Sequence, residues 1–147
     1  MTRNPTDLYH SLIRDQACAP RNFGPAPPDW RVFHAENPAC GDAFNLALDL
    51  DGGRIRAARF NGRGCAVSTA AFSVATELLT GEMLEDWQTR TEAIQRWLAG
   101  LTPFHPQWPD ALRAFEAVRQ FPSRVHCAAL PWQALLKPQP GHTEAPS

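Results

Sequence analysis

Apolar residues recur along the chain with two periods, and the change of period separates expected helices from expected strands. A spacing of three to four residues, typical of helices, runs through four segments: residues 6–17, 65–82, 82–100 and 110–120. Strand-like alternation or branched and aromatic content marks three others: residues 30–37, 43–50 and 55–60. We therefore expect a small group of strands flanked by helices.

The two alternating segments predict a β-hairpin. They are joined by Asp51-Gly52-Gly53, and Asp-Gly supplies the positive φ that tight hairpin turns require. The first strand alternates through its apolar residues Phe44, Leu46, Leu48 and Leu50. In the second, strict alternation would place Ile55, Ala57 and Arg59 on one face and Arg56, Ala58 and Phe60 on the other.

The end of the chain predicts one more helix. Pro131 would disrupt a helix interior, so we expect this helix to begin near Cys127, because the first-turn N–H groups lack partners anyway. After it, residues 138–147 have no apolar period and are expected to form a mobile tail. Residues 1–137 would then form a single domain.

Composition excludes several classes of protein. The 147 residues are 44% hydrophobic and 20% charged, with a net charge of −1, which offers no electrostatic footprint for nucleic acid or an anionic membrane. Neither a signal-peptide core nor a long apolar run is visible, so we expect a cytoplasmic protein whose partner is a protein or a small solute. In that reducing compartment, cysteines serve as thiols or metal ligands more often than as disulfides.

Three cysteines stand at the ends of expected elements. Cys40 precedes the hairpin and Cys65 follows it, so antiparallel pairing brings both to the same sheet edge. Cys65 and Cys127 are each expected at a helix start, where the helix dipole stabilises a thiolate. With Asp42, these thiols would complete a four-coordinate Zn²⁺ site, in which the carboxylate is the harder and more exchangeable ligand. A lone cysteine is often only buried, but their joint placement favours metal or sulfur chemistry. Cys18 lies apart and is interpreted as an incidental thiol.

Four segments carry a resemblance to a known family. They are "DLYHSLIRDQACAPRNFGP" at 7–25, "NPACGD" at 37–42, "FNGRGCAVSTA" at 60–70 and "RVHCAALPWQAL" at 124–135. In these segments the chain resembles the SufU branch of the IscU/NifU-like iron–sulfur cluster assembly proteins. The resemblance implies an α+β fold, with a small three-stranded antiparallel sheet packed against about five helices and a metal site at one edge.

The resemblance also implies roles for particular residues. Cys40, Asp42, Cys65 and Cys127 fall on the metal-ligand positions, with Zn²⁺ as the expected cofactor. Cys40 falls on the position that accepts sulfur as a persulfide from a SufS-type pyridoxal-phosphate-dependent cysteine desulfurase, and Arg124 on a basic position that assists. The chain would act as a zinc-dependent sulfurtransferase and desulfurase activator that passes sulfur to the SUF scaffold complex.

Two other functions remain open. The first is an IscU-like scaffold that assembles and transfers a [2Fe–2S] cluster, with iron or the cluster in place of zinc; His126, a competent metal ligand, would fit it. The SufU branch is favoured because the long stretch 66–126 includes an additional helical segment, and because "FPSRV" at 121–125 replaces the scaffold branch's LPPVK chaperone motif. The second alternative is a structural zinc domain that only makes protein contacts.

Overall fold

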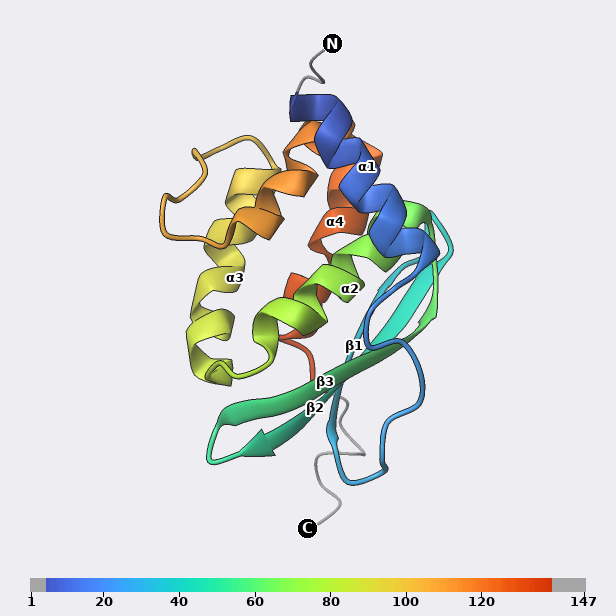
Figure 1. The fold of residues 1–147 in the computed structure, drawn as a ribbon, viewed down its shortest axis with the longest axis vertical. Coiled ribbons are helices and arrows are strands. Elements are labelled where there is room, and N and C mark those ends of the chain that lie inside the picture. The colour runs from blue at the N-terminus through green and yellow to red at the C-terminus, as the bar shows by residue number, and fades with distance from the viewer. Residues whose placement is uncertain (1–4, 139–147) are drawn as a thin grey trace.

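The computed structural model describes residues 5–138 and has an α+β architecture (Figure 1). A three-stranded antiparallel sheet lies along one side of the molecule, and helices cover one of its faces. The elements in chain order are α1 (Pro5–Cys18), β1 (Arg31–Asn37), β2 (Asp42–Asp51), β3 (Arg54–Arg63), α2 (Ala66–Leu79), α3 (Leu84–Leu98), the 3₁₀ helix η1 (Asp110–Gln120) and α4 (Pro122–Ala134). The predicted fold class is therefore confirmed.

The sheet has the order β1-β2-β3, and its second hairpin contains an irregularity that the sequence pattern did not predict. Asp49 pairs with Ala57 and Leu50 pairs with Ile55, so Arg56 has no partner on β2. This bulge shifts the alternation by one residue. As a result, Ile55 lies on the same buried face as Ala58 and Phe60, and strict alternation along β3 was a wrong expectation.

The covered face of the sheet forms the main core together with α2. Phe72 of α2 stacks on Phe44 of β2 and on Phe60 of β3, with ring centroids 4.6 and 5.7 Å apart. All three side chains are fully buried. This packing fixes α2 across the sheet, and so fixes the position of its N-terminus at the sheet edge.

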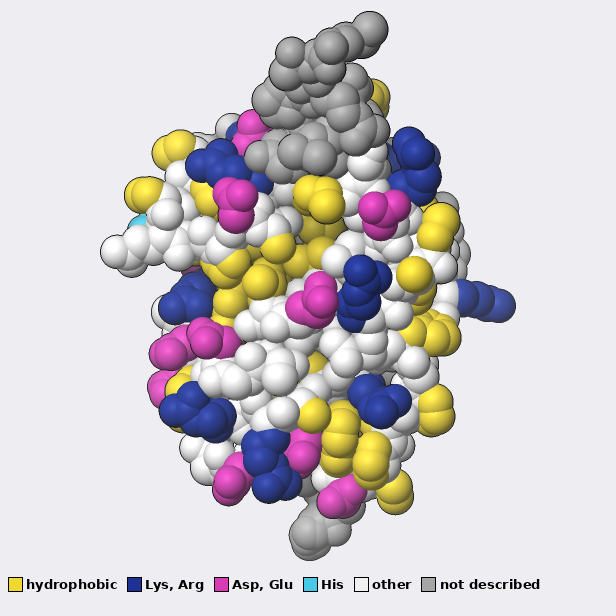
Figure 2. Space-filling model, in the orientation of Figure 1, with side chains coloured by type: hydrophobic (Ala, Val, Ile, Leu, Met, Phe, Trp, Pro, Cys, Tyr) yellow, Lys and Arg dark blue, Asp and Glu magenta, His cyan; other side chains and the backbone are white. Residues whose placement is uncertain are grey.

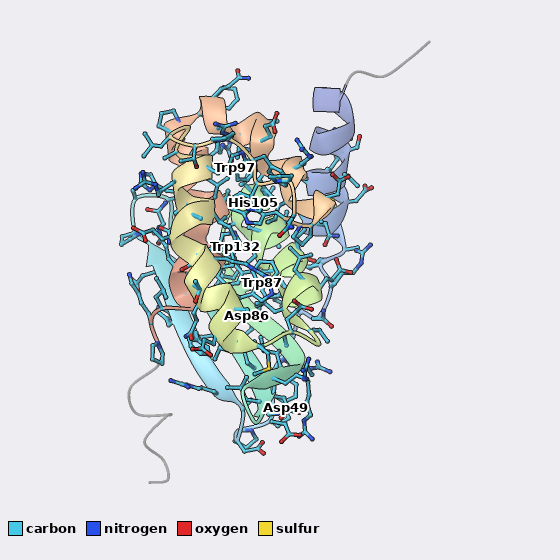
Figure 3. All side chains as sticks on the ribbon, turned by 90° about the vertical axis from the view of Figure 1, so that its left-hand side faces the viewer. Asp49, Asp86, Trp87, Trp97, His105 and Trp132 are labelled. Carbon is cyan, nitrogen blue, oxygen red and sulfur yellow. The ribbon has the colours of Figure 1, made fainter. Side chains whose placement is uncertain are left out.

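A second aromatic cluster attaches the segment after α3 to the rest of the molecule. The rings of Trp87 and Trp132 stack 5.4 Å apart and join α3 to α4 (Figure 3). Trp97 meets Phe104 and Trp108 edge to face, at 5.1 and 6.0 Å. The side chains of Trp87, Trp97 and Trp132 are buried and anchor this part of the core.

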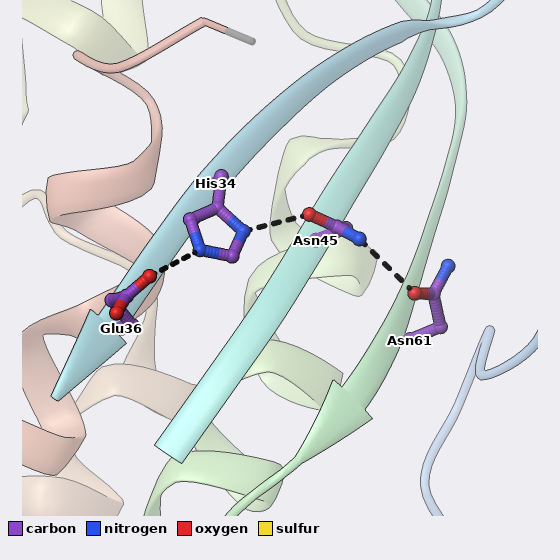
Figure 4. A network of polar contacts seen from close by, with 4 residues as sticks. All are labelled: His34, Glu36, Asn45 and Asn61. Atoms are coloured by element: carbon purple, nitrogen blue, oxygen red, sulfur yellow. Dashed lines mark hydrogen bonds and ion pairs between the residues drawn. The ribbon is translucent and has the colours of Figure 1, made fainter. Parts of the chain in front are cut away.

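The open face of the sheet carries a row of polar side chains that crosses all three strands (Figure 4). His34 Nδ1 lies 2.8 Å from Asn45 Oδ1, and Asn45 Nδ2 donates to Asn61 Oδ1 at 3.4 Å. His34 Nε2 lies 2.9 Å from a Glu36 carboxylate oxygen. The hydrogen bonds to Asn45 and Glu36, with the Glu36 charge, raise the pKa of His34 above its ordinary value of 6.5, although burial opposes them.

The last helix begins earlier than predicted. α4 starts at Pro122, so Cys127 lies inside the helix and not at its start. Pro122 occupies the first turn, where the missing N–H of a proline costs nothing. Pro131 is accommodated inside the helix, close to its C-terminal end. The argument that a helix N-terminus stabilises the Cys127 thiolate was therefore wrong.

The described chain ends against β1. The backbone N–H of His34 donates to the Lys137 carbonyl at 3.2 Å, and Pro138 forms an isolated bridge with Phe33. The rest of the predicted tail, residues 139–147, lies outside the described residues. On the face in Figure 2, acidic and basic side chains are interspersed. No helix within residues 5–138 is long and apolar enough to cross a membrane.

Candidate metal centre

Cys40 and Asp42 are positioned by the tight turn between β1 and β2. The Cys40 N–H donates to the Asn37 carbonyl at 3.0 Å, and Asn37 and Asp42 form the last pair of the strand ladder. Gly41, between the two candidate ligands, has a φ of +74°, which a side chain would strain. The turn leaves Cys40 exposed and directs Asp42, only 1% exposed, into the protein.

Cys65 reaches the same edge from the other side of the hairpin, where β3 ends and α2 begins. It is the N-cap residue of α2, and its sulfur accepts the Ser68 backbone N–H at 3.4 Å. Its own backbone N–H donates to Asp42 Oδ1 at 2.9 Å. The predicted helix start at Cys65 is therefore confirmed, and the carboxylate is bonded to the first residue of that start.

Cys127 approaches the site from α4 and is 1% exposed. Its thiol donates to Asp42 Oδ2 at 3.1 Å, so the two oxygens of one carboxylate contact two different elements. Burial, together with the hydrogen bond to Asp42 and the neighbouring Cys65, holds the pKa of the Cys127 thiol far above its ordinary range. In the absence of a cation, this thiol stays protonated.

The pKa of the Cys65 thiol is shifted in the opposite direction, below its ordinary value. Burial raises the pKa of its thiol, but hydrogen bonds from the Ser68 backbone, the Ser68 hydroxyl and the Cys127 thiol together outweigh burial, and the net shift is downward. Cys65 is therefore the more thiolate-prone of the two.

The residues at this edge fit a metal ion. Ligand atoms of Cys40, Asp42 and Cys127 all lie within 4.8 Å of one another. Tetrahedral Zn²⁺, with bonds of about 2.3 Å to sulfur and about 2.1 Å to oxygen, holds its ligand atoms roughly 3.5–3.8 Å apart. Small side-chain rotations suffice to reach that spacing, so these three residues can hold a metal ion. Cys65 is outside this group of three, although its sulfur contacts Cys127.

The remaining predicted residues lie around this cluster. Arg124 is exposed one helical turn before Cys127, and His126 is also exposed and outside the group of three. Cys18 is exposed at the end of α1 and lines, with Arg124, Ala66 and others, a groove of about 360 Å³. Cys18 is therefore nearer to the site than its position in the sequence indicated.

Two residues that contact the ligands were not predicted. Ser68 is fully buried, and its hydroxyl lies 3.6 Å from the Cys65 sulfur. A β-carbon on Gly64 would lie 2.5 Å from both Asp42 Oδ1 and Ser68 Oγ, so only glycine fits. The serine three residues after a helix-start cysteine was a usable signal, because a cap commonly bonds the third helical N–H. No sequence pattern indicated that Gly64 would lie so close to Asp42 and Ser68.

The fold and this site together define an α+β domain with thiol and carboxylate groups that can hold a metal ion at one edge of a small antiparallel sheet. The family model of the NifU-like N-terminal domain matches residues 8–137. The chain therefore belongs to the NifU-like N-terminal domain family, as the resemblance predicted. This is a family of iron–sulfur cluster assembly proteins.

Relatives from both branches of this family match most of the chain. The zinc-dependent sulfurtransferase SufU of Bacillus subtilis is 32% identical over 139 residues, covering 91% of this chain and 90% of the relative. The iron–sulfur cluster assembly scaffold protein IscU of Streptococcus pyogenes is 29% identical over 129 residues, covering 87% and 80%.

The fold is also found in a solved structure. The crystal structure of FiSufU from Fervidobacterium islandicum AW-1, a candidate assembly scaffold protein for the SUF system, superposes with a TM-score of 0.80. The two are 26% identical, and the match covers 90% of this chain and 96% of that one.

Proposed function

We propose that the protein is a zinc-dependent sulfur acceptor that takes the terminal sulfur of a persulfide onto Cys40. One observation carries this proposal: the four candidate ligands differ in their solvent exposure and in their hydrogen bonding. Asp42 and Cys127 are buried and Cys65 is half-buried, and all three take part in hydrogen bonds. Cys40 is exposed on a turn, and its sulfur has no hydrogen bond within the described chain.

The reaction needs a thiolate that a partner can reach. Zinc, when bound, would keep its cysteine ligands deprotonated at neutral pH. The Cys40 thiolate attacks the terminal sulfur of the partner's cysteine persulfide, a new S–S bond forms, and the partner's own S–S bond breaks. The partner's cysteine leaves as a thiolate and Cys40 carries the persulfide, so the exchange needs no outside oxidant.

Other residues hold the site while Cys40 reacts. Asp42, Cys65 and Cys127 are the proposed remaining metal ligands, and they are anchored to β2, α2 and α4. Arg124 presents an exposed guanidinium one turn from Cys127, suited to attracting and orienting the anionic persulfide.

The proposed partners follow from this chemistry and from the SufU relative. The sulfur donor is a SufS-type pyridoxal-phosphate-dependent cysteine desulfurase, and the SUF scaffold complex is the downstream acceptor. Because an exposed thiolate persists only where thiols are kept reduced, we expect the protein to work in the cytoplasm.

The second candidate is a scaffold for a [2Fe–2S] cluster, favoured by the IscU relative, which is named as a scaffold protein. The same cysteines and Asp42 would then hold the cluster, with His126 as an added ligand. Anaerobic reconstitution with iron and sulfide separates the two functions, because a scaffold forms a stable coloured cluster.

The decisive experiment measures cysteine turnover by the cognate desulfurase without added reductant, with and without the equimolar zinc-loaded protein. We expect a stimulation that follows zinc content, is lost in Cys40→Ala and is kept in Cys18→Ala, the matched exposed thiol. Absence of stimulation, with binding confirmed, would contradict sulfur acceptance and favour the scaffold. Equal stimulation by Cys40→Ala would refute the role of Cys40.

A further inference from the structure

Ser68 directs both of its hydrogen-bonding groups at one residue. Its backbone N–H donates to the Cys65 sulfur at 3.4 Å. Its hydroxyl lies within reach of two acceptors of Cys65, the sulfur at 3.6 Å and the carbonyl oxygen at 3.1 Å, and its single proton can serve either one. The side chain is 0% exposed, so water does not compete for these contacts.

The hydroxyl is also confined by its surroundings. It faces Gly64 so closely that a β-carbon there would lie 2.5 Å from Ser68 Oγ. The same β-carbon would lie 2.5 Å from Asp42 Oδ1, which is itself bonded to the Cys65 N–H. Asp42, Gly64, Cys65 and Ser68 therefore form one close-packed unit at the start of α2.

We propose that Ser68 is a positioning residue that holds Cys65 as a permanent metal ligand, so that ligand exchange is confined to Cys40. The inference rests on the proposed function, because it requires Cys65 to bind the metal. Ser68 acts through Cys65 and does not touch the reacting sulfur. Groups that hydrogen-bond to metal ligands fix their orientation, and their removal typically weakens metal binding about 10- to 100-fold.

The contrast with Cys40 explains what this arrangement achieves. A partner that displaces one ligand must displace the one required for sulfur acceptance. Cys65 is held by the N-cap geometry of α2 and by the Ser68 hydroxyl, whereas the Cys40 sulfur has no such contact within residues 5–138. The weakest attachment and the greatest exposure coincide at Cys40.

The test is site-resolved alkylation of the zinc-loaded full chain by limiting iodoacetamide, read for each cysteine by mass spectrometry. Exposed Cys18 serves as the internal reference for reagent activity. In the unaltered protein we expect Cys65 to be protected by zinc. In Ser68→Ala we expect Cys65 alkylation and zinc release to a chelator each to rise about tenfold, since the hydroxyl is lost while the backbone N–H remains.

Ser73→Ala is the matched control. Ser73 is also a fully buried serine of α2, but its hydroxyl accepts the Arg21 N–H at 2.7 Å and donates to Gln16, on the α1 side of the helix. The Ser73→Ala substitution should leave the protection of Cys65 from alkylation unchanged, even if it lowers thermal stability to the same degree as Ser68→Ala.

The outcomes distinguish the proposed metal site, which requires Cys65 as a ligand, from the proposed role of Ser68 in positioning Cys65. If zinc does not slow Cys65 alkylation in the unaltered protein, Cys65 is not a ligand, and both the proposed site and this inference fail. If zinc protects Cys65 equally in Ser68→Ala, only the role of Ser68 is overturned. Should Ser68→Ala not fold, Ser68→Thr and Ser68→Val provide an isosteric pair, and equal protection in that pair would overturn the role.

Discussion

The carboxylate of Asp42 accepts the backbone N–H of Cys65 through Oδ1 at 2.9 Å. The bond joins the first residue of β2 to the residue that caps α2, and it leaves Oδ2 facing Cys127 and the cluster of candidate ligands. Oδ1 therefore has a structural role, while Oδ2, which accepts the Cys127 thiol here, can bind a metal ion once that thiol has lost its proton.

This division of roles predicts different effects for two substitutions of Asp42. Asp42→Asn keeps an oxygen for the Cys65 N–H but loses the anionic ligand, so the fold should survive while zinc affinity falls at least about tenfold. Asp42→Ala also leaves the N–H unpaired, which should lower the free energy of unfolding by about 1–3 kcal/mol. Chelator competition and urea unfolding measure the two effects. If Asp42→Ala spares both zinc binding and sulfur transfer, Asp42 is not a functional ligand of the site.

Arg124→Ala should slow sulfur transfer without affecting the fold. The guanidinium is exposed, so thermal stability and zinc content should be unchanged. Loss of a cation that attracts the donor should reduce the transfer rate roughly tenfold at low salt, and by less at high salt. Single-turnover transfer of labelled sulfur to Cys40 measures this rate. Arg96→Ala, an exposed arginine of α3, is the control, and an equal loss in both variants would argue against a specific role.

Gly64→Ala should destabilise the protein because the added methyl group has no room beside its neighbours. The new methyl group would meet Asp42 Oδ1, Ser68 Oγ and the Phe44 ring at 2.5–2.6 Å. Overpacking of this kind costs about 1–3 kcal/mol in the free energy of unfolding, and here it should also weaken zinc binding. Gly52→Asn is the control, because this hairpin glycine has open space and a φ of 59° that asparagine accepts. A larger loss in the control would contradict the steric account.

His34 predicts a pH dependence of stability that is separate from the metal site. Its pKa is raised in the folded protein by Asn45 and Glu36, so its stabilising contribution is complete below 6.5 and is lost as the pH rises through the raised native pKa. The difference in unfolding free energy between the unaltered protein and His34→Gln should therefore be greater at about pH 5.5 than at about pH 8.5. Glu36→Gln should reduce this pH dependence. A difference that does not change with pH would contradict the prediction.

Local patterns in the sequence were sufficient to predict most of the helices and strands of the fold. The helical and alternating periods placed the strands and the other helices, and Asp51-Gly52 placed the hairpin turn. The proximity of Cys40 and Cys65 also followed, because an antiparallel hairpin must return its second strand to the edge where the first began. The start of α4 was misplaced because two prolines gave competing signals and the weight was given to Pro131 in place of Pro122.

The details of the site depended on tertiary packing. The sequence by itself determined which residue types reach the sheet edge: three thiols and one carboxylate. Only the packing of α4 and α2 against that edge decided that Asp42 would contact both Cys65 and Cys127 and that Cys127 would be buried. It also decided that Cys40 would be the exposed member of the four candidate ligands. These contacts join residues far apart in the chain, up to 85 positions for Asp42 and Cys127, and no local period specifies such pairs.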